Sequence, residues 1–500
     1  MNTKEDQHSV QDVGTGIESA TRRELSVQRT PVTFSFEKVG PVRKAELELG
    51  DLTIIAGRNN TGKSYLVYTL YGFLKMWNGW PGIRQFLTRT GQSKAGVPDM
   101  SKIARRLISE GKFILDAHPV SLENQRKEVL NQLCLDFSED AISQVFSSQS
   151  GDFSDASIAI DVGDRGDSND RYPIVSYQLP GAKSLRLQIK DDQLVLTLDV
   201  SNRRKLPPDL EYMVATGYLE ILLGPLFPEP FILSAERFGI SLFYRELDFT
   251  KNQLVDLLQK MGSDKDRDKY SPFLFIDRAT SRYALPIKDN IDYTRSLPDR
   301  KKDKSEFHSA KLFNDIKNMM DGYFSATGDE LRFISKARGP DRSFNVPLHL
   351  ASSSARGLSD LYFFLRHIAE RNHLLIIDEP ESHLDTANQI RVARLLARLV
   401  RAGLKVLITT HSDYLIKEIN NLIMLESDFE GRDAVLRSLK YTDDDVLQRT
   451  SIRAYVAQDS GLVPCDVDRF GIDMPLFDDT IDDINRVANE LSSRLEAERD

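Results

Sequence analysis

Cysteine is almost absent from this chain, whose 500 residues include only Cys134 and Cys465. Two cysteines are too few for a disulfide framework or for a zinc site built from cysteine ligands, and such scarcity is typical of a reducing cytoplasm. Apolar runs of about 18 residues, the length that crosses a bilayer, are missing as well. The first 30 residues are polar and contain no apolar segment of the kind found in secretory signals. We therefore expect a cytoplasmic protein with no membrane contact and a disordered tail over residues 1–30.

An excess of positive charge is also lacking. The formal net charge is −9 and the isoelectric point is near 5.6, which argues against a chain that coats nucleic acid with its whole surface. Net charge leaves a local basic groove open, because it says nothing about where the charges lie. The apolar share of 40% and the charged share of 28% are those of a globular protein, and 500 residues predict two structural units.

A glycine-rich loop lies between a short apolar strand, expected over residues 52–56, and a helix expected over residues 65–77. Its sequence follows the pattern G-x-x-x-x-G-K-S, the P-loop of nucleotide-binding proteins. Glycines let the backbone N–H groups point at phosphates, and the following helix adds its N-terminal dipole. Lys63 is expected to contact the β- and γ-phosphates of ATP, and Ser64 to ligate Mg²⁺. The residues predicted to bind the nucleotide are Gly57, Arg58, Asn59, Asn60, Thr61, Gly62, Lys63 and Ser64.

Two further strands end in polar residues. Asp378 and Glu379 follow the apolar residues 374–377, and His411 follows the strand expected over residues 405–410. Asp378 suits a Walker B carboxylate that holds the Mg²⁺ shell, whereas Glu379 is placed to polarise the attacking water. A lone histidine at a strand end is more often structural, but its place one strand after the acidic pair favours contact with the γ-phosphate. The predicted catalytic residues are Glu379, His411 and Lys63, and the predicted metal ligands are Ser64 and Asp378.

Residues 376–385 resemble the Walker B and D-loop segment of ABC-type ATPases, a group that includes the SMC, RecF-like and OLD families. In this resemblance Asp385 matches the D-loop aspartate, and His411 matches the switch histidine. The opening segment, residues 36–64, looks like the start of the AAA-type ABC ATPases that are abundant in bacterial defence islands. The candidates for the glutamine of the Gln-loop are Gln85 and Gln92.

Residues 351–361 resemble the ABC signature, with Ser352 as the signature serine and Arg356 as the basic residue that follows it. Ser353 and Ser354 stand where the family has two glycines, whose backbone normally approaches the γ-phosphate of the opposing protomer. The resemblance implies a homodimer or higher homo-oligomer with composite ATP sites. Ser352 and the D-loop aspartate would then complete the nucleotide site of the partner copy.

The expected fold is α/β: a P-loop NTPase of the ABC-ATPase type, in which helices flank a mostly parallel sheet, with a large α+β insertion. About 310 residues separate Lys63 from Asp378, far more than a compact core needs. Within this stretch, helices are predicted over residues 101–146 and strands over residues 157–200. The expected domains are a disordered tail (1–30), the N-terminal part of the ATPase domain (31–80), the insertion (81–330), the C-terminal part of the ATPase domain (331–440) and a C-terminal helical extension (441–500).

Three further features have both an ordinary and a functional interpretation. The basic run at residues 300–304 could contact phosphate, but interleaved acidic residues favour a solvated loop. Arg237 follows a predicted buried strand and could approach the nucleotide or a lobe interface, although a buried ion pair explains it equally well. The acidic clusters at residues 443–445 and 478–483 favour helix caps or a solvated surface over a catalytic metal site.

The resemblance to PtuA-type and AriA-type ATPases implies an ATP-dependent sensor and regulatory scaffold of a bacterial antiphage defence system. Its expected partners are further copies of the chain and a separately encoded effector, either a nuclease or a toxin. The alternative is a RecF- or SMC-like DNA-repair or recombination ATPase, which predicts salt-sensitive DNA binding and DNA-stimulated ATP turnover. An ABC transporter subunit is disfavoured by the replaced signature glycines and by the large insertion.

Overall fold

The computed structural model describes residues 31–78, 98–116, 119–148, 151–163, 174–179, 182–190, 193–201, 206, 210–224, 226–243, 283–308, 311–327, 330–336, 344–458, 460–474 and 484–494. The chain divides into two compact units, and each is described by itself. The described residues of the smaller unit come from 83–132 and 165–227, and those of the larger unit from 30–82, 133–164 and 228–500. The predicted tail at 1–30 and the two Gln-loop candidates, Gln85 and Gln92, lie outside the described residues.

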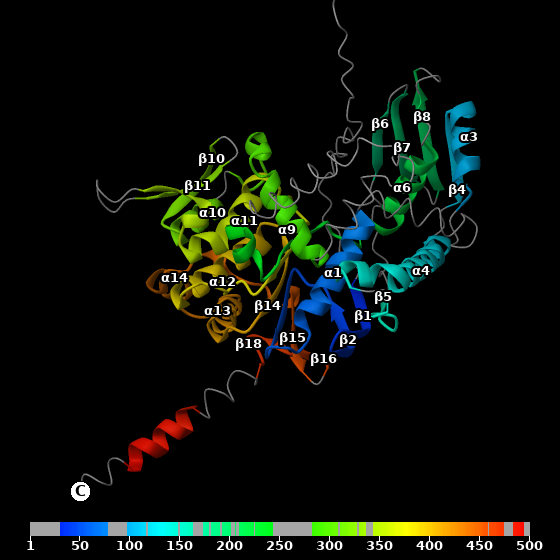
Figure 1. Cartoon of the computed structure of the whole chain (residues 1–500). Coiled ribbons are helices and arrows are strands. Elements are labelled where there is room, and N and C mark those ends of the chain that lie inside the picture. Colours follow the sequence, from blue (N-terminus) through cyan, green and yellow to red (C-terminus); the bar gives the residue numbers. More distant parts are fainter. Residues whose placement is uncertain are drawn as a thin grey trace, which may run out of the picture. The chain divides into compact units, whose positions relative to one another are not determined.

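A nine-stranded mixed sheet forms the centre of the larger unit (Figure 1). Its strands are β1 (Val32–Val39), β2 (Val42–Glu48), β3 (Leu52–Gly57), β5 (Ser157–Val162), β9 (Pro230–Leu233), β13 (Leu374–Asp378), β14 (Lys405–Thr410), β15 (Ile452–Gln458) and β16 (Gly461–Cys465). The strand order is β5-β1-β2-β16-β15-β3-β14-β13-β9. All neighbours from β15 to β9 are parallel, whereas β1 pairs antiparallel with β2 and with β5.

The burial of each strand follows from its place in this sheet. Every residue of β3 and β13 is buried, because parallel central strands are covered on both faces. In β1, buried residues alternate with partly exposed ones over its first half, as expected for an outer antiparallel strand. The register pairs Ala56 of β3 with Thr410 of β14, and Thr409 of β14 with Asp378 of β13. The carboxyl ends of these three strands therefore meet at one edge of the sheet.

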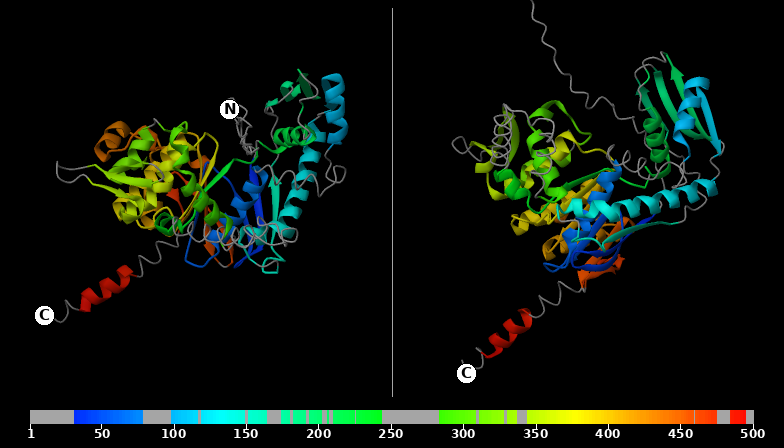
Figure 2. Two further views of the ribbon diagram at one scale, coloured as in Figure 1. Left: turned by 45° about the horizontal axis from the view of Figure 1, so that its top comes forward. Right: turned by 45° about the vertical axis from the view of Figure 1, so that its right-hand side comes forward.

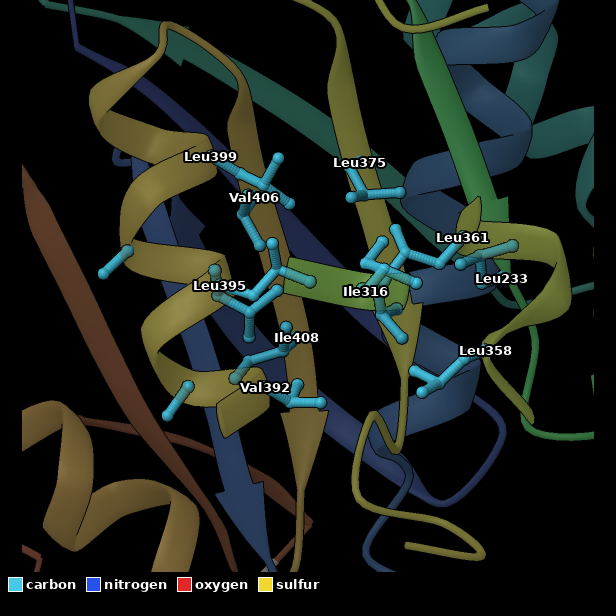
Figure 3. Packing of buried hydrophobic residues seen from close by; sticks show 14 of the residues in the cluster. Leu233, Ile316, Leu358, Leu361, Leu375, Val392, Leu395, Leu399, Val406 and Ile408 are labelled. Carbon is cyan, nitrogen blue, oxygen red and sulfur yellow. The ribbon is translucent and has the colours of Figure 1, made fainter. Parts of the chain in front are cut away.

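Helices cover both faces of the sheet in the larger unit. They are α1 (Lys63–Asn78), α5 (Ile142–Val145), α9 (Leu285–Ser296), α10 (Lys311–Met319), α11 (Ser353–His367), α12 (Thr386–Arg401), α13 (Asp413–Met424) and α14 (Arg432–Leu439). Helix α1 contacts β1, β3, β9 and β13. The apolar residues of α12 recur at helical spacing, and Figure 3 shows Leu395 and Leu399 pointing toward Val406 and Ile408 of β14. No helix among the described residues is both long enough and apolar enough to cross a membrane.

Shorter elements complete the described part of the larger unit. A three-stranded antiparallel sheet contains β10, β11 and β12, and its Phe324, Leu331 and Phe333 belong to the same buried cluster as α10 and α11. The bounds are β10 Gly322–Thr327, β11 Glu330–Ser335, β12 Asn345–Pro347, β17 Val467–Asp468 and β18 Gly471–Ile472, a π-helical turn at Phe137–Ala141, and 3₁₀ turns at Asp299–Lys302, Leu348–Leu350, Asp443–Asp445 and Arg449–Ser451.

The smaller unit contains a four-stranded antiparallel sheet in the order β4-β8-β7-β6 (Figure 1). Strands β6, β7 and β8 are green in the two further views (Figure 2). Its elements are β4 (Lys112–Asp116), β6 (Val175–Leu179), β7 (Ala182–Lys190), β8 (Gln193–Val200), α3 (Met100–Glu110), α4 (Pro119–Asp136, which continues into the larger unit) and α6 (Leu210–Leu223). Buried and exposed residues alternate along β8, as expected of a strand with one covered face. Helix α3 begins at Asp99, whose side chain accepts a hydrogen bond from the N–H of Lys102.

The fold prediction is confirmed, because a mostly parallel sheet flanked by helices carries the P-loop. Two expected boundaries differ from what the structure shows. The described residues of 133–164 with strand β5, strand β9 and the described residues of 283–330 lie in the larger unit, although they were expected within the insertion at 81–330. The helical extension expected over 441–500 contains two strands of the central sheet, β15 and β16, and its described helix, 484–494, is exposed. The mixed sequence of β15 does not by itself predict a strand. Its strand conformation depends on parallel pairing with β3.

Strand β4 also interrupts the stretch predicted to be helical over 101–146. Its pairing with β8, more than 70 residues away in the sequence, is a tertiary contact that local periodicity does not report.

We expect Ile408→Ala to lower the free energy of unfolding of the larger unit by about 2–5 kcal/mol. Ile408 is fully buried in β14, between Ile54 of β3 and Ile377 of β13, so truncation leaves a cavity in the centre of the sheet. Urea denaturation followed by circular dichroism measures the change. Val435→Ala on the exposed face of α14 is the control and should shift the free energy by less than about 0.5 kcal/mol. Equal shifts for the two variants would contradict the central role of β14.

Candidate active site

The P-loop connects the carboxyl end of β3 to the first turn of α1. Two of its positions require glycine. A Cβ atom on Gly62, which has φ of +90°, would lie 2.5 Å from Cγ2 of Val42, and a Cβ atom on Gly57 would lie 2.7 Å from the carbonyl oxygen of Ala457. Asn60 adopts a left-handed conformation with φ of +65°. The loop is therefore wrapped tightly against β2 and β15, with the N-terminus of α1 at its end.

Lys63 is buried at the base of this loop. Its Nζ donates hydrogen bonds to the carbonyl oxygens of Gly57 (3.1 Å) and Arg58 (2.9 Å). Burial lowers the pKa of the Lys63 amine, while the nearby carboxylates of Glu379, Asp378 and Glu381 act in the opposite direction. The P-loop lysine thus lies near the acidic residues at the end of β13 and in the turn after it.

Asp378 ends β13 and is almost completely buried. Its Oδ1 accepts a hydrogen bond from the hydroxyl of Thr409. Burial raises the pKa of the Asp378 carboxyl, and hydrogen bonds from Thr409 and Ser64 oppose that shift. Its Oδ2 is buried and has no hydrogen-bond partner among the described residues.

These two side chains fit a Mg²⁺ ion. Oδ2 of Asp378 is an unsatisfied oxygen, and the Ser64 hydroxyl interacts with the same carboxyl, so both side chains offer oxygen ligands that suit the ion. The described residues contain no group of three or more His, Cys, Asp or Glu side chains that could hold a metal ion. A nucleotide-linked Mg²⁺ does not need one, because phosphate oxygens and waters supply the remaining ligands.

Glu379 has an unusual backbone, with φ of +52° in a residue that is not glycine. Its N–H donates to the carbonyl oxygen (3.2 Å) and to the hydroxyl (3.1 Å) of Thr409. Its carboxylate accepts a hydrogen bond from the Ser382 hydroxyl (2.9 Å) and lies 3.5 Å from Nε2 of His411. Hydrogen bonding to His411 is the main reason that the pKa of Glu379 is lowered to about 2. An ionised carboxylate of this kind orients a water molecule better than it removes a proton.

His411 follows β14 and is fixed by a residue that the sequence analysis did not single out. Oε1 of Glu381 accepts hydrogen bonds from the N–H of His411 (2.6 Å) and from the hydroxyl of Thr410 (2.9 Å). Burial raises the pKa of Glu381. The sequence signal for Glu381 was its place as the second glutamate of the Glu-Pro-Glu segment after β13. Its hydrogen-bond partners, Thr410 and the N–H of His411, could not be predicted from the sequence.

Tyr68 and Glu236 also come to this edge of the sheet, and sequence reasoning missed both. Tyr68 lies four residues after Ser64, hence on the same face of α1, and its hydroxyl donates to Oε2 of Glu236 (3.1 Å). Burial is the largest cause that raises the pKa of Tyr68, and Asp378 and Glu236 add to it. Glu236 follows β9, so its approach to Asp378 depends on β9 being the neighbour of β13. Strand order is not encoded in local periodicity.

The predicted signature and D-loop residues lie at two exposed helix starts. Ser352 caps α11, where its hydroxyl accepts from the N–H of Ala355 (3.2 Å), and Asp385 caps α12, where its carboxylate accepts from the N–H (2.9 Å) and Nδ2 (3.0 Å) of Asn388. Among the described residues, neither is hydrogen-bonded to the P-loop or to the acidic pair at the end of β13 of the same chain.

Residues 249–416 match the family described as AAA ATPase domain, a span that contains the signature-like segment, Asp378, Glu379 and His411. A stretch of 74 residues is 35% identical to an uncharacterized ABC transporter ATP-binding protein of Haemophilus influenzae and covers 15% of this chain. The match spans only 28% of the length of that relative. The family match and the geometry of the site support an ATPase domain with a P-loop.

Solved structures with an alignable fold include two SMC head domains. One, from Pyrococcus furiosus, has an extended coiled coil and is bound to the C-terminal domain of ScpA; it is 12% identical, with 92% of this chain and 99% of that chain covered and a TM-score of 0.32. The other, from Thermotoga maritima, is 11% identical, with 88% and 100% covered and a TM-score of 0.31. Scores this low carry no inference about the function of this chain.

Asp360 of α11 is a fully buried carboxyl close to the site. Burial raises its pKa to about 7, against the opposing effects of Arg237 and of the Ser359 hydroxyl. Its Oδ2 has no hydrogen-bond partner among the described residues. The folded protein therefore binds a proton at Asp360 more tightly than the unfolded chain does.

We expect Asp360→Asn to gain stability relative to the wild type as pH rises. In the wild type, the stabilisation that protonated Asp360 provides is full below its ordinary pKa of 3.8 and is lost as pH rises through about 7. The asparagine stays neutral, so the difference in free energy of unfolding should grow by roughly 2 kcal/mol between about pH 5 and pH 8. Urea denaturation at several pH values measures this difference. A difference that stays constant over the range would contradict the raised pKa.

Proposed function

We propose that this chain binds and hydrolyses ATP. The observation that carries the proposal is the meeting of Lys63, Asp378, Glu379 and His411 at one edge of the sheet, with the Ser64 hydroxyl beside Asp378. These residues come from the ends of the adjacent parallel strands β13 and β14 and from the start of α1, which follows the P-loop after β3. A lysine, a metal-binding hydroxyl and carboxylate, a water-orienting carboxylate and a γ-phosphate sensor are the groups that phosphoryl transfer to water requires.

In the proposed mechanism, Lys63 and the backbone N–H groups of the P-loop bind the triphosphate. Ser64 and Asp378 would hold Mg²⁺, which would supply positive charge to neutralise the phosphate oxygens. Glu379 orients the attacking water, and His411, hydrogen-bonded to Glu379, senses the γ-phosphate. The low pKa of Glu379 keeps its carboxylate ionised throughout the neutral range, so its role is to accept a hydrogen bond from that water.

The assembly that we propose is a homodimer or a higher homo-oligomer with composite ATP sites. Ser352 and Asp385 are both exposed and lie at the N-termini of α11 and α12, where positive helix ends attract phosphate. Their matches to the signature serine and D-loop aspartate support a role in the nucleotide site of a second copy. Ser353 and Ser354 replace the usual glycines of that surface.

For the cellular role, we propose an ATP-dependent sensor and regulatory scaffold of a bacterial antiphage system, acting on a separately encoded nuclease or toxin. The support is the resemblance of residues 36–64 and 376–385 to the ATPases of defence islands. The alternative is a RecF- or SMC-like ATPase that binds DNA, with which the same ATPase fold is equally consistent. In the basic run proposed for DNA contact, Arg300 lies 3.8 Å from Asp303 and also donates to Ser296, which favours the solvated interpretation of this segment.

We expect Lys63→Ala to weaken ATP binding about 10- to 100-fold, because a charge-assisted contact to the phosphates is lost. Glu379→Gln should keep ATP binding but lower turnover about 100- to 1000-fold, since the amide cannot polarise the water as a carboxylate does. Phosphate release and equilibrium binding of a fluorescent ATP analogue measure the two effects. Glu430→Gln, on an exposed surface loop, is the matched control and should leave both unchanged. Normal turnover in Glu379→Gln would remove Glu379 from the mechanism.

The Glu379→Gln variant should also trap the ATP-bound assembly. By light scattering, we expect its mass to rise from one chain to at least two when ATP and Mg²⁺ are added, and to stay at one chain when Lys63→Ala is added to the same protein. A mass that does not respond to ATP would contradict the composite site.

The same trapped variant, purified from its native host, separates the two cellular roles. Co-purification of a stoichiometric nuclease or toxin would support the defence scaffold. Recombination proteins or bound DNA without such a partner would support the DNA-repair alternative.

A further inference from the structure

Arg237 is a buried arginine that the ATPase mechanism above does not use. It begins the short helix 237–243 directly after β9, and only 3% of it is exposed. Its guanidinium donates to the carbonyl oxygens of Asp378 (Nη1, 2.7 Å) and Glu379 (Nη2, 2.7 Å). It also donates to those of Ser234 (Nη1, 3.0 Å) and Gly357 (Nε, 3.3 Å). One side chain therefore joins the end of β9, the turn after β13 and helix α11.

Burying a guanidinium is unfavourable unless its donors are satisfied and its charge is balanced. Burial lowers the pKa of Arg237, and Asp360, Asp378, Glu381 and Glu379 oppose this effect. Four of its five N–H donors bind protein carbonyls. Lysine has three donors on a single atom and cannot span the same set of acceptors. These four hydrogen bonds therefore require the several donor atoms of a guanidinium.

The turn that Arg237 binds is the one that carries Glu379. That residue has a left-handed backbone, and its N–H is held by Thr409 while its carbonyl oxygen is held by Arg237. The same carbonyl oxygen accepts a hydrogen bond from the N–H of Ser382 (3.1 Å). Both ends of the strained residue are therefore fixed, and its side chain is directed toward His411.

Phe238, the residue after Arg237, also holds the start of the short helix 237–243 in place. Its ring stacks on His383 with a centroid distance of 4.2 Å, and the guanidinium of Arg356 lies 4.4 Å from its centroid. His383 precedes the D-loop aspartate by two residues, and Arg356 belongs to the signature-like segment. Contacts on both sides of Phe238 therefore keep the backbone at Arg237 in place.

We propose that Arg237 is a positioning residue for ATP hydrolysis, an inference that rests on the proposed ATPase function. It fixes the backbone of Asp378 and Glu379, and so keeps the Glu379 carboxylate beside His411. Its protein contacts account for four of its five N–H donors, so its effect is on the hydrolysis step and not on nucleotide affinity. A displacement of about 1 Å at a reacting group can cost about 100-fold in rate.

The test compares Arg237→Met and Arg237→Lys with the control Arg394→Met, all in the full chain. Arg394 is a partly buried arginine on α12 that pairs with Glu418 and packs on Tyr441, remote from the residues of the proposed mechanism. In Arg237→Met we expect kcat to fall about 100-fold while the Kd of a fluorescent ATP analogue changes by less than about 3-fold. Arg237→Lys should show a smaller fall in kcat, and Arg394→Met should leave both values unchanged.

Hydrogen exchange in the nucleotide-free protein tests the same claim without any activity measurement. The amides of Ser382 and Leu384, which donate within the turn after β13, should exchange faster in Arg237→Met and not in Arg394→Met. Unchanged kcat and unchanged exchange in a folded variant would overturn the proposal, as would a loss of nucleotide affinity equal to the loss of kcat. If Arg237→Met does not fold, Arg237→Lys carries the test by the same two measurements.

The two proposals fail in different ways. If the wild type shows no turnover that depends on Glu379, the ATPase function is wrong, and the exchange rates still decide whether Arg237 holds the turn. If turnover depends on Glu379 but not on Arg237, the ATPase function stands and the positioning role is wrong.

Discussion

The parallel pairing of β3, β14 and β13 is the constraint on which the candidate site depends. Because the register pairs Ala56 with Thr410 and Thr409 with Asp378, the three strands end together at one edge of the sheet. About 310 residues separate Lys63 of the P-loop from Asp378, and helix α12 and strand β14 lie between the acidic pair and His411, so the three segments meet only through this register. Thr409 also links β14 to the end of β13 directly, since its hydroxyl donates a hydrogen bond to the Asp378 carboxylate and accepts one from the N–H of Glu379.

Balanced charge is the second requirement at this edge. Lys63 and Arg237 are buried cations, and the carboxylates of Asp378, Glu379 and Glu381 lie close enough to both to oppose the effect of burial. The carboxylates are not equivalent, because burial raises the pKa of Asp378 and Glu381 whereas His411 and Ser382 lower that of Glu379. Different surroundings thus separate the carboxylate proposed to bind a metal from the ionised one proposed to orient water.

Helices α11 and α12 combine structural and proposed binding roles at their N-termini. Ser352 and Asp385 satisfy orphan N–H groups of their own helices, which is a sufficient local reason for serine and aspartate at these positions. The same helix ends are exposed and positively polarised, which suits contact with the phosphates of a nucleotide on another copy. Arg237 also links helix α11 to the turn after β13, because it donates hydrogen bonds to the carbonyl oxygens of Gly357 and Glu379. The start of α11 and the backbone of Glu379 are therefore held by the same side chain.

Helices and strands with a local sequence pattern could be predicted from the sequence alone. The apolar runs of β3, β13 and β14, the glycine pattern of the P-loop and the periodicity of α12 each predicted the observed element and its candidate side chains. Tertiary structure alone decided strand order, which places β9 beside β13 and inserts β15 next to β3. This strand order brings Glu236 and Arg237 to the turn after β13. It also places strands β15 and β16 where a C-terminal helical extension was expected. The physical reason is that periodicity reports which face of an element is buried, whereas strand neighbours and the partners of buried charges are set by long-range pairing.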